Sequence, residues 1–62
     1  MKAKEAAEIV SKNPKTTIDE IKGMIPDYPN PLNRRQWIFN FLKHLPQGLQ
    51  PNYRQGLLDS QK

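Results

Sequence analysis

Residues 34–45 read RRQWIFNFLKHL and carry the strongest core pattern of this 62-residue chain. Large apolar side chains recur there at helical spacing, namely Trp37, Ile38, Phe41, Leu42 and Leu45. Such spacing is typical of a helix that buries one wide apolar face. The pattern predicts a helix over residues 34–45 with Asn33 as its N-cap. The helix should end at Pro46-Gln47-Gly48, because proline and glycine interrupt helices.

Two shorter helices are predicted upstream. Residues 2–12 form the first, and its buried face consists of Ala3, Ala6, Ala7 and Val10. It ends at Asn13-Pro14, since the residue before a proline is pushed out of the helical region. The second begins at Thr17, because Thr17 followed by Glu20 matches a capping box. Its buried stripe is Ile18, Ile21 and Ile25, and Pro26 ends it.

The last fourteen residues give a weaker pattern. In residues 49–62, Tyr53, Leu57 and Leu58 suggest a short helical turn that covers the core. Strands are not expected there, because Ile38 is the only β-branched residue after Ile25. The expected fold is therefore all-α, with a small three-helix domain of helix-turn-helix type over residues 1–48. An irregular or short-helical C-terminal arm, partly disordered at its end, follows over residues 49–62.

Composition limits the possible classes of protein. The chain contains no cysteine, so it has neither disulfides nor thiolate metal ligands. Its longest apolar run, residues 37–39, is far below the roughly 20 residues that span a bilayer. No signal-peptide pattern opens the sequence. We expect an intracellular, cytoplasmic protein that does not bind membranes. With 35% hydrophobic residues its core is thin, which leaves a homodimer open.

The side chains needed for catalysis are sparse. His44 is the only histidine, and no nucleophile with a neighbouring base is evident. The adjacent acids Asp19 and Glu20 are explained by helix capping rather than by general acid–base chemistry. There is no glycine-rich phosphate loop. We expect a protein that is not an enzyme and that uses neither cofactor nor metal.

The net charge of the chain is concentrated in its second half. Residues 28–58 contain no Asp or Glu, and their basic residues are Arg34, Arg35, Lys43 and Arg54. The only Trp and both Phe lie in the same stretch. Basic side chains interleaved with aromatic ones favour a polyanion or an acidic protein surface as the partner.

The polar side of the predicted helix 34–45 is the candidate binding surface. Helical spacing places Arg35, Gln36, Phe39, Asn40 and Lys43 opposite the core side chains. Arg34 and Arg35 also stand at the predicted helix start, where free amides could bind a phosphate. The candidate binding residues are Arg34, Arg35, Gln36, Phe39, Asn40, Lys43 and Arg54. A solvated helix face with one stray aromatic residue is an equally simple interpretation.

Parts of residues 6–49 resemble a winged helix-turn-helix domain. The stretch AAEIV at 6–10 and the stretch NPKTTIDEI at 13–21 are similar to that family's first two helices. The segment FLKHL at 41–45, followed by Gly48-Leu49, resembles its recognition helix and the entry to its wing. The resemblance implies DNA binding, and the DNA-reading positions that it implies are Arg34, Arg35, Gln36, Phe39, Asn40 and Lys43. The chain departs from the family in its longer, proline-rich connector at 26–32 and in residues 49–58, which lack β-branched residues for a hairpin.

Two functions remain open from the sequence. The first is a small basic regulatory protein that binds nucleic acid, DNA in preference to RNA, through helix 34–45. Four basic groups would give a salt slope of roughly −3 to −4. The second is a protein-interaction module, an inhibitor or adaptor, that binds an acidic partner surface. In that case Phe39 is the anchor, and Arg35 and Lys43 form a steering rim.

Overall fold

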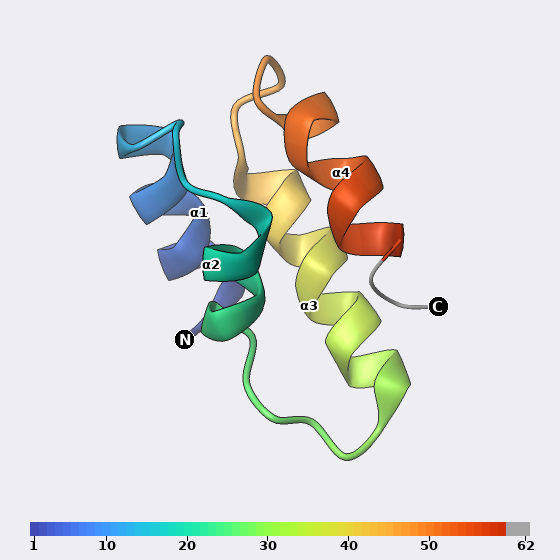
Figure 1. The fold of residues 1–62 in the computed structure, drawn as a ribbon. Helices are drawn as coiled ribbons and strands as arrows, with labels where there is room; N and C mark the ends of the chain where they lie inside the picture. The colour runs from blue at the N-terminus through green and yellow to red at the C-terminus, as the bar shows by residue number, and fades with distance from the viewer. Residues whose placement is uncertain (60–62) are drawn as a thin grey trace.

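The computed structural model describes residues 1–59, and those residues form four helices and no strand. In chain order they are α1 (Ala3–Lys12), α2 (Ile18–Met24), α3 (Pro31–His44) and α4 (Gln50–Asp59). In Figure 1, α3 runs through the middle of the molecule, with α1 and α2 on one side and α4 on the other. The expected all-α class is confirmed, but the described residues contain four helices rather than three.

The first two helices follow their predicted patterns. The buried residues of α1 are Ala3, Ala6, Ala7 and Val10, as the helical spacing requires. At the start of α2, the Glu20 amide donates to Thr17 Oγ1 at 3.2 Å. In return, the Thr17 amide donates to Glu20 Oε1 at 3.4 Å, which completes the capping box. The helix ends before Pro26, with Ile25 as its C-cap.

The apolar side of α3 forms the centre of the core. Ile38 and Phe41 are completely buried, and Trp37, Leu42 and Leu45 are nearly so. The Trp37 and Phe41 rings stack with centroids 5.5 Å apart and planes 6° from parallel. The Trp37 indole N–H also donates to the backbone oxygen of Met1 at 2.8 Å. This bond fastens the N-terminal end of the chain to α3.

The start of α3 differs from the sequence prediction. The helix begins at Pro31 rather than Arg34, and its N-cap is Asn30 rather than Asn33. The Asn30 side chain accepts a hydrogen bond from the Leu32 amide at 2.9 Å. Pro31 takes the first helical position, where its fixed φ suits the helix and its missing N–H breaks no intrahelical bond. The predicted start was three residues too late, because Pro31 was expected to belong to the connector.

The second correction concerns the predicted C-terminal arm, where residues 50–59 form α4 rather than a short turn. Tyr53 and Leu57 are buried in the same core as the residues of the first three helices. The Tyr53 hydroxyl donates to the Pro14 oxygen at 2.8 Å, and the Gln50 side-chain amide donates to the Leu45 oxygen at 3.1 Å. Packing therefore stabilises a segment of low intrinsic helix propensity. The predicted disorder at the end of the arm lies outside the described residues.

Gly56 lets α4 approach α2 closely. A Cβ atom at this position would lie 3.0 Å from Ile18 Cδ1 and 3.1 Å from Ile18 Cγ1. Gly23 offers a contrast, because no atom lies within 4 Å of the place where its Cβ would be. A side chain at position 56 would press on Ile18, whereas one at position 23 would meet open space, so Gly23 only weakens its helix.

A matched pair of substitutions tests this difference. Gly56→Leu should lower the free energy of unfolding by about 1–3 kcal/mol, because the added side chain overpacks the contact with Ile18. Gly23→Leu should leave stability unchanged or raise it by up to about 0.8 kcal/mol through helix propensity. Urea unfolding followed by circular dichroism measures both. Equal effects of the two substitutions would contradict the close approach of α4 to α2.

The docking of α4 can be tested at the Tyr53 hydroxyl. Tyr53→Phe should cost about 1 kcal/mol of unfolding free energy, because it leaves the partly buried Pro14 oxygen without its donor. Tyr28→Phe is the control, since the Tyr28 side chain is exposed. It should change stability by less than about 0.5 kcal/mol. Indistinguishable unfolding curves for the two variants would show that α4 does not depend on this hydrogen bond.

Candidate functional site

One side of α3 is exposed along the whole helix. It carries six side chains, which we call the α3 face: Leu32, Arg35, Gln36, Phe39, Asn40 and Lys43. All six are exposed, while the opposite side of the helix is buried in the core. The phase of the helix predicted from the sequence is therefore confirmed, and five of the seven candidate binding residues lie on this one surface.

Two large apolar side chains stand out on the α3 face. Leu32 is 69% exposed and Phe39 is 39% exposed. They are seven residues apart, which places them on the same side of the helix two turns, about 10 Å, from each other. Leu32 was not among the predicted binding residues, because its place beside Pro31 indicated the connector. Proline at the first helical position was the available indication that the helix begins earlier.

Polar side chains of the α3 face contact each other in two places. The Arg35 guanidinium lies over the Phe39 ring, 5.5 Å from its centroid, in cation–π geometry. The Gln36 side-chain amide donates to Asn40 Oδ1 at 3.4 Å. Both pairs are four residues apart, the spacing at which helical side chains meet. They give the exposed side chains a preferred arrangement before any partner binds.

The other two candidate residues are separated from the α3 face. Arg34 precedes Trp37, Ile38 and Phe41 by three, four and seven residues, so it projects from the core side of α3 and is half-buried. Arg54 is exposed but belongs to α4, which packs against the apolar side of α3. Only Arg35 and Lys43 place positive charge on the face itself.

The proposed phosphate position at the start of this helix is also displaced. Because α3 begins at Pro31, Arg34 and Arg35 are its fourth and fifth residues. The Leu32 amide in its first turn is already bound by the Asn30 side chain. Arg34 and Arg35 therefore do not stand at the helix end, where the sequence predicted them beside free amides.

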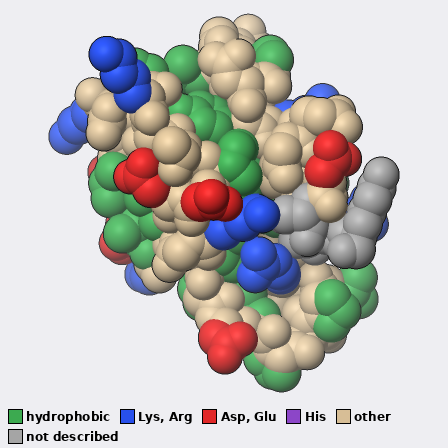
Figure 2. All heavy atoms as spheres, viewed as in Figure 1, with side chains coloured by type: hydrophobic (Ala, Val, Ile, Leu, Met, Phe, Trp, Pro, Cys, Tyr) green, Lys and Arg blue, Asp and Glu red, His purple; other side chains and the backbone are tan. Residues whose placement is uncertain are grey.

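The α3 face is free of acidic residues, unlike other parts of the surface. Figure 2 shows Lys or Arg side chains intermixed with Asp or Glu side chains over α1 and α2. Within residues 28–58 the sequence contains no acid.

Among the described residues, no three His, Cys, Asp or Glu side chains are placed to hold a metal ion. No helix in that part of the chain is long and apolar enough to cross a membrane.

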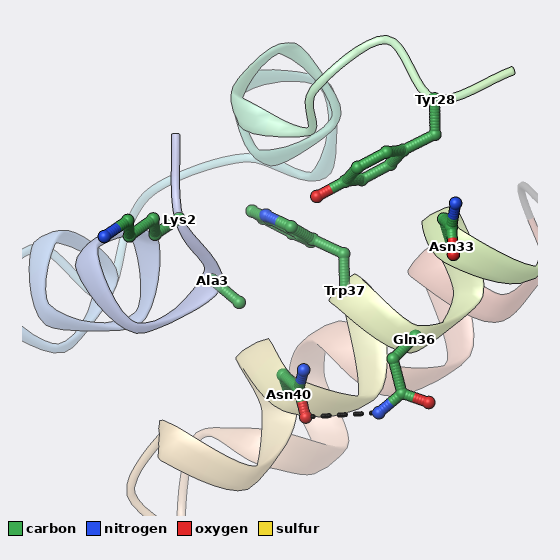
Figure 3. Close-up of a pocket in the computed structure, with 7 residues that line it drawn as sticks. All are labelled: Lys2, Ala3, Tyr28, Asn33, Gln36, Trp37 and Asn40. Carbon is green, nitrogen blue, oxygen red and sulfur yellow. Dashed lines mark hydrogen bonds between the residues drawn. The ribbon is translucent and has the colours of Figure 1, made fainter.

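A cleft of about 280 Å³ borders the α3 face. Its aromatic walls are Tyr28 and Trp37, and the N-terminal end of α1 contributes Lys2 and Ala3. Three carboxamides of α3 complete the lining, those of Asn33, Gln36 and Asn40. Figure 3 shows the Tyr28 hydroxyl directed toward the indole of Trp37, with the carboxamides along one side. Gln36 and Asn40 belong to both the cleft and the α3 face, so the two surfaces are continuous.

No family model matches the sequence, and neither a curated protein nor a solved structure shows a significant match. The resemblance to a winged helix-turn-helix domain stays a prediction. The residues that it would place in the wing form α4, which packs against α2 and α3. The α3 face is therefore interpreted below from its own chemistry.

The exposure of Phe39 predicts that it contributes little to folding. Phe39→Ala should change the free energy of unfolding by less than about 1 kcal/mol, whereas Phe41→Ala should cost about 3–5 kcal/mol. Phe41 is fully buried and Phe39 is 39% exposed, which is the physical reason for the contrast. Thermal and urea unfolding of the two variants measure it. A large loss for Phe39→Ala would mean that this side chain has a structural role.

Proposed function

We propose that this chain is a protein-interaction module that docks the α3 face onto an acidic partner surface. The observation that carries the proposal is the exposure of Leu32 and Phe39 on one side of α3, next to Arg35 and Lys43 and without any acid. An apolar helical ridge of this kind fits a groove on a partner, where residues about seven apart act as anchors.

The apolar anchors are expected to supply most of the affinity. Burying a Leu or Phe side chain that was exposed is worth about 1.5–3 kcal/mol, and each of these two is exposed only in part. A solvent-exposed ion pair contributes about 0.2–1 kcal/mol. Arg35 and Lys43 therefore serve mainly to steer and orient an acidic partner, while Leu32 and Phe39 hold it.

The charge of the face disfavours pairing with a second copy of itself. Face-to-face association would bring Arg35 and Lys43 of one chain toward the same residues of another, with no acid on the face to compensate. Like charges in contact are destabilising. A different partner that carries acidic residues matches the surface better than a homodimer through α3.

Nucleic-acid binding is the second candidate. It is favoured by the exposed Arg35, Gln36, Asn40 and Lys43, because these residue types pair with base edges. However, the face presents two basic side chains rather than four. Two phosphate contacts give a salt slope of only about −2, which corresponds to weak electrostatic binding. Any nucleic-acid affinity of a single chain should therefore be low and should depend on Arg35 and Lys43.

Variants of the α3 face distinguish the two functions. Peptides are selected from a random display library on the immobilised protein, and their affinities are measured by fluorescence anisotropy, with random duplex DNA in parallel. Leu32→Ala/Phe39→Ala should weaken the selected acidic peptides at least about tenfold, equivalent to 1.4 kcal/mol. Arg35→Gln/Lys43→Gln should weaken them less and mainly slow their association.

Matched controls come from elsewhere on the surface. Ile9→Ala removes an apolar side chain that is 42% exposed on α1, and Arg54→Gln removes a basic one on α4. Neither should change peptide affinity by more than about twofold. Peptides without acidic residues, or with affinity unaffected by Leu32→Ala/Phe39→Ala, would contradict the proposal. Micromolar DNA binding that is lost in Arg35→Gln/Lys43→Gln alone would establish the second candidate instead.

A further inference from the structure

The cleft beside the α3 face has a composition that selects its ligand. None of its lining residues is acidic, and five of them can donate hydrogen bonds. The donors are the carboxamides of Asn33, Gln36 and Asn40, the Tyr28 hydroxyl and the Lys2 ammonium. The Lys2 charge, with no acidic residue in the lining, favours an anionic acceptor over a cation.

The carboxamides are placed to serve a ligand. The Gln36 amide nitrogen already donates to Asn40 Oδ1, which leaves the Asn40 amide group available as a donor. Asn33 and Asn40 are exposed, and Figure 3 shows Asn33 near Tyr28 at one end of the cleft and Asn40 farther along α3, beyond Gln36. In that view the Lys2 ammonium is turned outward from Trp37. An exposed lysine has a flexible four-carbon stem, so its charge is free to turn toward an anion at the mouth of the cleft.

The walls and the volume restrict the ligand further. The Tyr28 and Trp37 rings offer apolar surface, but the Trp37 indole N–H is already bound to Met1 and adds no donor. The cleft encloses about 280 Å³. This is just below the range of about 300–1,000 Å³ that holds small-molecule ligands and cofactors. A single side chain with a short apolar stem and a charged end fits within this open volume.

We propose that the cleft receives the carboxylate side chain of a Glu or Asp from a partner segment that lies along the α3 face. This inference rests on the proposed function, because Gln36 and Asn40 connect the cleft to that face. The methylene stem contacts the aromatic walls, while the carboxylate accepts a hydrogen bond from the Asn40 carboxamide and attracts Lys2. The acidic partner thus gains a fixed position for one of its charges.

The test uses small probes, so it does not depend on finding the partner. The nitrogen-15-labelled protein is titrated with N-acetyl-glutamate N-methylamide, with the corresponding glutamine compound, and with adenosine. The Trp37 indole signal and the side-chain amide signals of Asn33 and Asn40 report binding. The glutamate compound should shift these signals saturably in the millimolar range, and the glutamine compound should bind at least fivefold more weakly.

Two isosteric substitutions provide a matched comparison. Asn40→Asp places a negative charge in the cleft and should weaken the glutamate compound at least tenfold. Asn52→Asp makes the same change at an exposed position of α4 and should have no effect. Both positions are exposed, so both variants should keep the native Trp37 indole signal, which checks folding in the same spectra.

The titration tests carboxylate binding in the cleft separately from the proposed function of the α3 face. Equal binding of the glutamate and glutamine compounds, equal weakening by both substitutions, or an absence of saturable shifts would overturn it. Saturable shifts with adenosine but not with the glutamate compound would also overturn it and assign the cleft to a nucleobase. Peptide binding that depends on Leu32 and Phe39 would stand in all of these cases. If the peptide selection fails, the titration still decides whether the cleft binds a carboxylate side chain.

Discussion

The buried side of α3 is the constraint on which the rest of the structure depends. Phe41 and Ile38 are fully enclosed, and Trp37 stacks on Phe41 while its N–H holds the backbone of Met1. Rotation of α3 by one residue about its axis, roughly 100°, would expose part of this set and bury polar side chains. The rotational setting of the helix is therefore fixed by packing. The α3 face is fixed by the same packing, because it is the remaining side of the same helix.

A core this small requires every helix to contribute to it. The first two helices supply small and medium side chains, α3 supplies the Trp37 and Phe41 rings, and α4 adds the fully buried Leu57 and the Tyr53 ring. A domain of about 60 residues buries only some 60% of the surface of its unfolded chain, so losing one helix exposes a large share of the core. This dependence explains why residues 50–59 fold despite Pro51, Asn52 and Gly56, which are poor helix formers. Tertiary contacts with α2 and α3 outweigh local propensity there.

The parts predicted well from the sequence were those set by local patterns. The apolar spacing of residues 37–45 gave the phase of α3, and Thr17 with Glu20 gave the start of α2. The misplaced start of α3 arose because one residue has two structural roles. Pro31 reads as a connector residue but also suits the first position of a helix, so Leu32 and its exposure were missed. The cleft was not predictable, because it joins Lys2, Tyr28 and α3 through a tertiary arrangement that no short pattern encodes.

The division of α3 into a core side and an exposed side has a consequence for binding. The backbone of the face is held by the core, and the Arg35–Phe39 and Gln36–Asn40 contacts already limit its side chains. In the proposed function, association would then lose less conformational entropy than docking of a disordered segment, and two partly exposed apolar side chains would be enough for it. The same division separates substitutions on the α3 face from substitutions in the core. Changes at Leu32 and Phe39 are expected to act on the proposed binding, whereas changes at Trp37 and Phe41 are expected to act on folding, because one helix turns different side chains toward solvent and toward the core.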